Sequence, residues 1–176
     1  MGEQDDVRNF RTVCGRFATG VTVILTDTPE GVHGMTANAF MSVSLDPLLV
    51  AVGVHRNGRM AGLLKDHGTR FSISILAREQ QAAAEFYSRP GAVRTADGLD
   101  IQVTDDGLPI MARGLAWMEC CTESLVEAGD HYLVLARAMR CRLDWQLSPL
   151  VFYAGHYWEH LDRERDNPIE WQLLEL

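Results

Sequence analysis

Small and hydroxyl-bearing residues crowd residues 34–45, a composition suited to holding a ligand against the main chain. Glycine, alanine and serine leave room for a flat molecule to reach the peptide groups, which are obligatory hydrogen-bonding partners. Alternate residues of an extended chain point to one face, which here consists of Thr36, Asn38, Phe40, Ser42 and Ser44. We predict that this face is the floor of a polar ligand site. A Ser/Thr-rich strand and turn at a sheet edge would explain the composition equally well.

A histidine follows a turn sequence far downstream, at Gly129-Asp130-His131. Taken alone, Gly-Asp is common hairpin chemistry, and a histidine at a strand end is usually a half-exposed side chain. The sequence carries no Ser/His/Asp, paired-carboxylate or metal-ligand constellation with convincing spacing, so no metal site is predicted. It also lacks the glycine patterns of a Rossmann dinucleotide site and of a P-loop.

The four cysteines are Cys14, Cys120, Cys121 and Cys141, and their spacing is not that of a metal site. Adjacent Cys120 and Cys121 would point to opposite faces of a strand. No feature near these residues suggests the lowered thiolate pKa that a catalytic cysteine needs. We therefore predict buried free thiols.

The elements that position the polar segment begin with a helix over residues 7–18, because Phe10, Val13, Cys14 and Phe17 follow helical spacing. A β-branched strand is predicted at residues 21–26, and a second strand is predicted from Val32 onward. A turn with proline and glycine separates the two. The polar segment thus continues a hairpin.

Further strands with few helices follow along the chain. Residues 48–54 form a continuous apolar run that predicts a strand buried on both faces. The remaining predictions are a helix over residues 59–65, a strand over 71–76, a helix over 78–86, a mobile surface loop over 88–98, strands over 114–126 and 131–145 joined as a hairpin, and a short strand within 150–158. In the 131–145 strand, His131, Leu133 and Leu135 share the face predicted to point inward. Many strands without a βαβ pattern favour an antiparallel barrel decorated by helices.

Length and composition favour one domain over residues 1–176, with residues 1–6 and about 162–176 as flexible tails. The net charge of −8 argues against a nucleic-acid partner. No apolar stretch approaches the ~18 residues of a membrane span, and the first residues lack the features of a secretory signal. We therefore expect a cytoplasmic protein with no membrane partner.

Four segments occur in an order and spacing that resemble a known family: residues 10–23, 34–38, 42–47 and 129–131. Together they resemble the short flavin reductases that serve two-component flavin monooxygenases. The resemblance runs from about Phe10 to about Tyr157, nearly the whole chain. It implies a mainly β fold with peripheral helices, the FMN-binding split barrel, which is an antiparallel split β-barrel.

The resemblance also implies a function and a site. FMN or FAD would be reduced by NADH or NADPH, and reduced flavin would pass by diffusion to a separate monooxygenase. A homodimer is expected, because the resembled proteins bind flavin at the subunit interface. His131 would position the nicotinamide by a hydrogen bond, without a covalent role. The implied cofactor-binding residues are Met35, Thr36, Ala37, Asn38, Ala39, Ser42, Val43, Ser44, Asn57, Gly58, Arg59, Ser74, Asp130, His131, Tyr153 and His156.

The sequence departs from the family pattern at two of these places. The family often has Ser or Thr in the phosphate-contacting turn, where this chain has Asn57-Gly58-Arg59, and Arg59 could bind phosphate itself. Ser74 stands where the family has asparagine. These departures leave an alternative open: a flavoprotein that retains its flavin and acts as an oxidase or tailoring enzyme, or only binds flavin.

Overall fold

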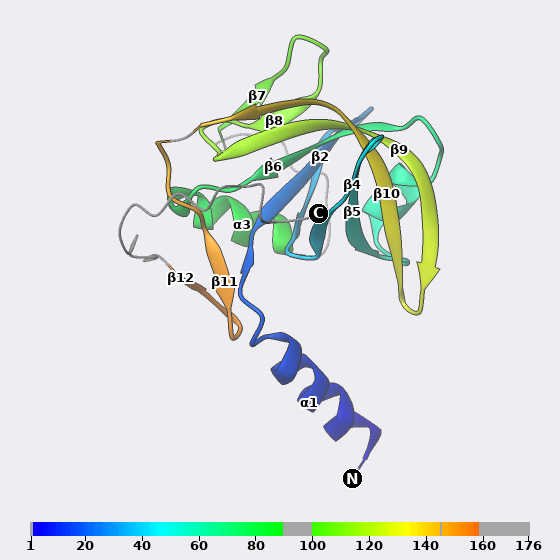
Figure 1. Cartoon of the computed structure of the whole chain (residues 1–176), viewed down its shortest axis with the longest axis vertical. Coiled ribbons are helices and arrows are strands. Elements are labelled where there is room, and N and C mark those ends of the chain that lie inside the picture. Colours follow the sequence, from blue (N-terminus) through cyan, green and yellow to red (C-terminus); the bar gives the residue numbers. More distant parts are fainter. Residues whose placement is uncertain (1, 90–99, 145, 159–176) are drawn as a thin grey trace.

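The computed structural model of the chain describes residues 2–89, 100–144 and 146–158. The helices are α1 (Glu3–Cys14), α2 (Arg59–Leu64) and α3 (Gln81–Ser88), with the short 3-10 helix η1 (Arg78–Gln80) before α3. The strands are β1 (Thr19–Gly20), β2 (Thr22–Thr28), β3 (Gly31–Ala37), β4 (Phe40–Leu45), β5 (Leu48–His55), β6 (Arg70–Ile75), β7 (Ile101–Val103), β8 (Pro109–Met111), β9 (Ala116–Ala128), β10 (His131–Leu143), β11 (Val151–Tyr153) and β12 (His156–Trp158). The prediction of a mainly β fold with peripheral helices is confirmed (Figure 1).

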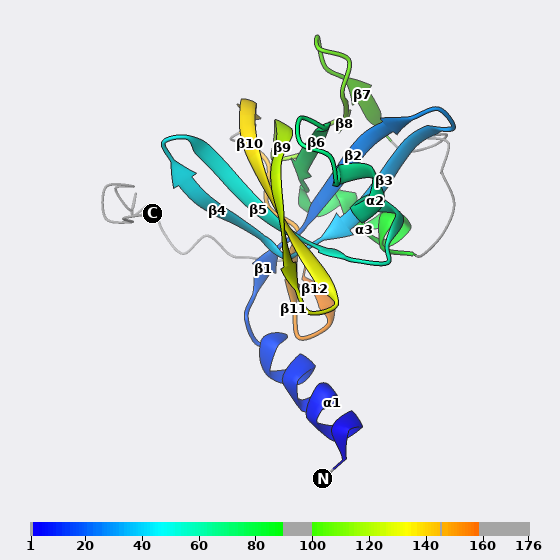
Figure 2. The same cartoon turned by 90° about the vertical axis from the view of Figure 1, so that its right-hand side faces the viewer.

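Seven antiparallel strands form the main sheet, in the order β3-β2-β6-β9-β10-β5-β4. Its two edges, β3 and β4, are consecutive in the chain and are separated only by Asn38 and Ala39. The sheet therefore curls until its edges meet at this bend (Figure 2). One hydrogen bond joins the bend to β5, from the Gly53 N–H to the Ala39 carbonyl oxygen at 2.9 Å. Edges that meet without pairing along their length make an open, split barrel.

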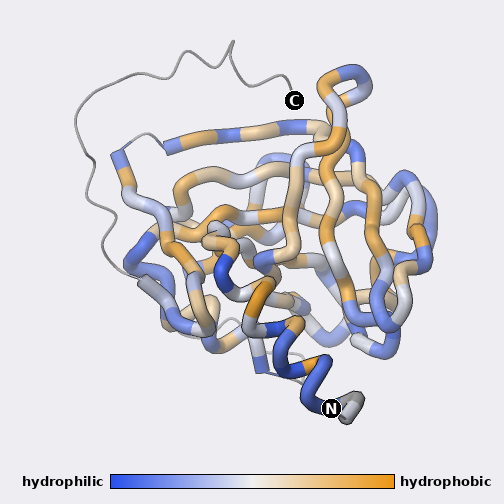
Figure 3. The backbone as a smooth tube through the Cα atoms, turned by 60° about the horizontal axis from the view of Figure 1, so that its bottom comes forward, coloured by the Kyte–Doolittle hydropathy of each residue, from blue (hydrophilic) through white to orange (hydrophobic). Residues whose placement is uncertain are grey.

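Two hydrophobic clusters fill the space on either side of β2. Ile24 belongs to the inner cluster with Phe71 and Val134, which the curled sheet and α2 enclose. Val23 and Leu25 point to the opposite face, where α3 and β11 cover them. In Figure 3, orange, hydrophobic stretches recur through the body of the molecule, whereas the helix beside the N-terminus is mostly blue. The central strands β2 and β6 are therefore buried on both faces along most of their length.

The inward face of β10 is the reverse of the one predicted from sequence. Val134 and Ala136 are fully buried in the inner cluster. His131 and Leu133 therefore lie on the opposite face of the strand. The error arose because Leu133 and Leu135 are apolar, and the sequence offers no sign of which of two apolar faces meets the core. A bulge between Ala138 and Arg140 then interrupts the alternation of faces along β10.

Helix α1 is confirmed but begins at Glu3, so residues expected to be a flexible tail form its first turn. Acidic Asp5 and Asp6 favour this end of a helix because of the helix dipole. The helix projects away from the sheets (Figure 2). Its apolar stripe is exposed, with Phe10 69% accessible. Within a single chain, α1 is therefore an amphipathic helix whose apolar face does not pack against the core.

The predicted buried thiols are partly wrong. All four cysteines are free, but Cys14 and Cys141 are exposed, whereas Cys120 is buried and Cys121 is half-buried. Burial raises the pKa of the Cys120 thiol to about 12. The surface loop predicted at residues 88–98 and the C-terminal tail lie almost wholly outside the described residues. Within the described part of the chain, no helix is long and apolar enough to cross a membrane.

Candidate functional site

Two turns that sequence reasoning treated separately meet at one end of β5 and β10. His55 and His131 are directly opposite one another in the two strands. The Arg56 N–H donates to the Asp130 carbonyl oxygen at 2.9 Å, and Arg56 Nη1 donates to the Gly129 carbonyl oxygen at 3.3 Å. The turn after β5 is therefore fixed to the β9–β10 turn, and the predicted phosphate and nicotinamide segments are neighbours.

His131 is held by its sequence neighbour and by a second histidine. Its Nδ1 lies 2.7 Å from Asp130 Oδ1, and its side chain is 45% exposed. The ring of His55 meets the His131 ring edge-on, with centroids 5.2 Å apart. His55 Nδ1 accepts a hydrogen bond from the Asn57 N–H at 3.2 Å. With Nδ1 of His131 bonded to Asp130, its Nε2 is the ring nitrogen left for a ligand.

The Asp130 carboxylate is well suited to orient this imidazole. The hydrogen bond from His131 holds the pKa of the Asp130 carboxyl below its usual value. A carboxyl with a lowered pKa stays ionised at neutral pH, and the pairing is lost only as the pH falls through that lowered pKa. The Asp130 carboxylate therefore remains available as a hydrogen-bond acceptor for the His131 ring across the neutral range.

The bend at Asn38 and Ala39 lies over the same face of the sheet. A Cβ added to Gly53 would lie 3.0 Å from the Ala39 Cβ, so Ala39 covers the side of β5 on which Gly53 lacks a side chain. Gly53 and His55 are two residues apart and share this side with Leu133 and His131, which pair with them in β10. We call the surface made by Ala39, Gly53, His55, His131 and Leu133 the His55–His131 face.

The predicted floor of alternating polar residues is not one continuous face. Thr36 lies near the end of β3, and its hydroxyl donates a hydrogen bond to the Ala84 carbonyl oxygen of α3 at 2.7 Å. After the bend, a bulge between Ser42 and Ser44 makes Val43 an extra residue in β4. A bend and a bulge each break the two-residue period. Asn38, Ala39, Ser42 and Val43 are exposed, and Ser44 is half-buried.

Several other predicted residues lie away from this face. Ser74 is fully buried, and its Oγ accepts a hydrogen bond from the Met111 N–H at 3.0 Å, so the hydroxyl serves the core. Ala37 is also buried, in the inner cluster, with half-buried Met35 packed against that cluster. Arg59 forms a 2.7 Å ion pair with Glu30, a carboxylate that an anionic ligand would have to replace.

Tyr153 and His156 belong to a different sheet, with order β1-β11-β12. The Tyr153 hydroxyl accepts from Arg16 Nη1 at 3.4 Å, and its ring contacts Trp158. No contact within one copy brings either side chain to the His55–His131 face among the described residues. Asn57 and Gly58, in contrast, lie in the turn beside it.

Sequence reasoning missed Gly53, His55 and Arg56. A glycine in the middle of an apolar strand often marks a close approach of another backbone, and that signal was available in the sequence. His55 and Arg56 stood directly before the turn that had been singled out. Their pairing with the β9–β10 turn depends on strand register, which the sequence did not specify.

Comparisons with known proteins agree on one family. Residues 14–159 match the family model described as flavin reductase like domain. The chain is 40% identical over 152 residues to the NADH-dependent flavin reductase StyB of Pseudomonas fluorescens, covering 84% of this chain and 86% of the relative. It is 31% identical over 170 residues to HsaB of Rhodococcus jostii, the reductase subunit of a flavin-dependent monooxygenase, covering 97% of this chain and 86% of that protein.

Solved structures of proteins with similar sequences have the same fold as this chain. The NADH:FAD oxidoreductase SgcE6 of Streptomyces globisporus, in complex with NAD and FAD fragments, superposes with a TM-score of 0.85 at 30% identity, covering 94% of this chain and 99% of that one. The styrene monooxygenase flavin reductase SMOB of Pseudomonas putida has a TM-score of 0.77 at 39% identity, with 85% and 96% covered. The resemblance seen in the sequence is confirmed, and the chain belongs to the flavin reductase like domain family.

Proposed function

We propose that this protein is an NADH-dependent flavin reductase that reduces FMN or FAD and passes reduced flavin by diffusion to a separate monooxygenase. The observation that carries the proposal is the meeting of the Asn38–Ala39 bend, the turn after β5 and the β9–β10 turn on one face. Two relatives are named NADH-dependent flavin reductases, which supports the reduction of flavin by NADH. A third is named as the reductase subunit of a flavin-dependent monooxygenase, which supports the transfer of reduced flavin to a separate monooxygenase.

The residues of the His55–His131 face fit a flavin. Ala39 in the bend has a small side chain and Gly53 in β5 has none, so a flat ring can approach the exposed backbone there. Asn38, Ser42 and Asn57 add exposed polar side chains around it. Arg56 has no carboxylate partner among the described residues, and its guanidinium is a suitable group for a nucleotide phosphate. When bound, the nicotinamide and the flavin supply hydride transfer between themselves.

The protein's own task on this face is to position two rings and exclude side reactions, which requires no acid or nucleophile. Asp130 holds the His131 ring through Nδ1. Nε2 is then free to hydrogen-bond a carboxamide or phosphate of the pyridine nucleotide. We assign His131 to the nicotinamide and the Asn38–Ala39 bend to the flavin.

A simple assay tests the function. Purified protein mixed with NADH and either FMN or FAD should oxidise NADH, followed at about 340 nm, far faster than the spontaneous reaction and without a third substrate. Absence of turnover with both flavins and both nicotinamide nucleotides would overturn the proposal. A yellow cofactor that co-purifies and that NADH does not reduce would favour the alternative, a flavoprotein that keeps its flavin.

We also propose that the working form is a homodimer of single-domain copies. The β4–β5 hairpin exposes Met41, Leu45 and Leu48, and α1 exposes Phe10. Exposed apolar surface of this kind marks an interaction site in a folded protein. A second copy would also offer a route by which Tyr153 and His156 reach a flavin that they do not reach in their own chain.

Enlarging Gly53 is expected to weaken flavin binding. A valine at position 53 would push Ala39 and the bend away from β5, at a cost of about 1–2 kcal/mol, which is roughly tenfold in Kd. Flavin titration by fluorescence quenching measures the change. Gly20→Val is the matched control, because a Cβ at that strand position meets nothing within 4 Å. Equal flavin affinity in both variants would contradict the placement of the bend.

His55 is expected to position His131 through its ring. His55→Asn keeps an acceptor near the Asn57 N–H but removes the edge-on ring contact, whereas His55→Phe keeps a ring and removes the acceptor. An aromatic contact is worth about 0.5–1.5 kcal/mol, so His55→Asn should lower kcat/KM for NADH roughly two- to tenfold. His55→Phe should lower it less. The reverse order would show that the Asn57 hydrogen bond is what matters.

A further inference from the structure

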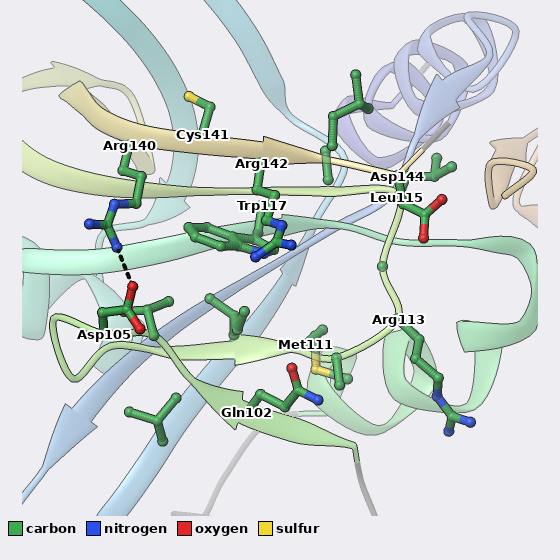
Figure 4. A pocket seen from close by; sticks show the side chains of 17 residues that line it. Gln102, Asp105, Met111, Arg113, Leu115, Trp117, Arg140, Cys141, Arg142 and Asp144 are labelled. Carbon is green, nitrogen blue, oxygen red and sulfur yellow. Dashed lines mark hydrogen bonds and ion pairs between the residues drawn. The ribbon is translucent and has the colours of Figure 1, made fainter. Parts of the chain in front are cut away.

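A separate concave surface lies at the far end of β9 and β10 from the His55–His131 face. Its cavity, of about 620 Å³, is bounded by the β7–β8 hairpin, residues 111–117 and residues 140–144 (Figure 4). Twelve residue steps of β10 separate His131 from Leu143, roughly 40 Å along an extended strand. The volume falls within the range of small-molecule sites, about 300–1,000 Å³. None of its lining residues belongs to the His55–His131 face or to the Asn38–Ala39 bend, so this cavity is distinct from the proposed flavin site.

The charges around the cavity leave one guanidinium uncommitted. Arg140 Nη1 pairs with Asp105 Oδ2 at 3.3 Å, and Arg113 pairs with Asp100. Arg142 is exposed and has no carboxylate partner among the residues that the structure describes. Figure 4 shows its side chain within the lining. The cavity thus presents a single positive charge that is available to a ligand.

An aromatic wall lies next to that charge. Trp117 of β9 is directly opposite Arg142 of β10, so the two side chains are cross-strand neighbours. Both are drawn among the side chains that line the cavity in Figure 4, and buried Ile110 and Met111 also line it. A half-buried indole beside a free guanidinium combines a flat apolar surface with a fork that matches a carboxylate in a bidentate manner.

We propose that this cavity binds a small planar molecule carrying one carboxylate, with its ring against Trp117 and its carboxylate on Arg142. A monoanion is favoured over a phosphate dianion, because Asp105 and Asp144 also line the cavity and would repel a second negative charge. The proposal does not depend on the reductase function, since neither flavin nor nicotinamide takes part in it.

The test is calorimetric titration of the full chain with naphthalene-2-carboxylate in the absence of flavin and NADH. We expect saturable binding that Arg142→Gln weakens by roughly tenfold or more, with a smaller loss for Arg142→Lys, which keeps the charge but not the fork. Trp117→Leu, which keeps an apolar wall without the flat ring, should weaken it several-fold. Arg70→Gln is the matched control, because Arg70 is an exposed strand arginine outside the cavity.

Two further ligands decide the chemistry. The uncharged naphthalene-2-carboxamide should bind at least roughly tenfold more weakly if the carboxylate is recognised. Adenosine monophosphate should bind more weakly than the naphthoate, and tighter binding of the nucleotide would overturn the assignment to a monocarboxylate. No binding of the naphthoate, or equal binding by the Arg142→Gln and Arg70→Gln variants, would overturn the site. Any of these outcomes is independent of whether the protein oxidises NADH.

Discussion

Replacing His131 with alanine is expected to raise the apparent KM for NADH while leaving flavin affinity nearly unchanged. The substitution removes the imidazole that Asp130 and His55 hold at the edge of the His55–His131 face. Loss of one hydrogen bond to a polar or charged group of the nucleotide costs about 1–3 kcal/mol, roughly five- to a hundredfold in kcat/KM. This is the largest kinetic effect that we predict for a single side chain.

Steady-state kinetics with varied NADH, beside a flavin titration, separates the two effects. His67→Ala is the control, because His67 is an exposed histidine on another turn. Asn38→Leu should show the opposite pattern, weaker flavin binding, because bulk would enter at the bend. An unchanged KM in His131→Ala, with the fold intact by circular dichroism, would mean that the β9–β10 turn is only a hairpin.

Substituting valine for Gly34 is expected to cause the largest loss of stability. A Cβ at this position would overlap the ring of Tyr87 and lie 2.7 Å from Leu25 Cδ2. Both neighbours belong to the cluster between α3 and β2, where they cannot move without opening the packing of α3. Overpacking at such a site costs about 3 kcal/mol, or roughly 6–12 °C in Tm for a chain of this size.

Thermal unfolding followed by circular dichroism measures the loss. Gly62→Ala is the control, because a Cβ there meets nothing and alanine favours the interior of α2. Combining Gly34→Ala with Tyr87→Leu should recover part of the stability that Gly34→Ala alone loses, since a smaller side chain then faces position 34. A Tm for Gly34→Val close to that of the wild type would show that α3 is not packed as described.

Gly34 shows how composition alone can misjudge the space beside a residue. The absence of a side chain suggested room for a ligand, but the space beside Gly34 is filled by the chain's own Tyr87. Ser74 is similar: the resemblance implied a ligand contact at this strand position, and its hydroxyl accepts a hydrogen bond from the Met111 N–H in the core. Buried polar groups must find partners, and a sequence does not say whether the partner is a ligand or the protein.

Most of the main-sheet strands and the family could be predicted from the sequence alone. Apolar periodicity located the strands of the main sheet, and local turn chemistry placed the β9–β10 hairpin at Gly129 and Asp130. Periodicity did not predict the β7–β8 hairpin, and it placed the first helix at residues 7–18 where the structure has α1 at Glu3–Cys14. The order of the segments from residues 10–23 to 129–131 identified the flavin reductases. These features depend on interactions between near neighbours in the chain, which a single sequence displays directly.

Which strand faces and which turns meet depends on the three-dimensional fold. The bend at Asn38 and Ala39, the register that sets His55 opposite His131, and the approach of Ala39 to Gly53 all depend on how a seven-stranded sheet curls. Shifting a strand by one residue exchanges its two faces, and bulges at Val43 and Met139 make such shifts within a strand. Register is fixed by packing between residues far apart in sequence, so it was the fold that selected His55 and Arg56 and set Ser74 in the core.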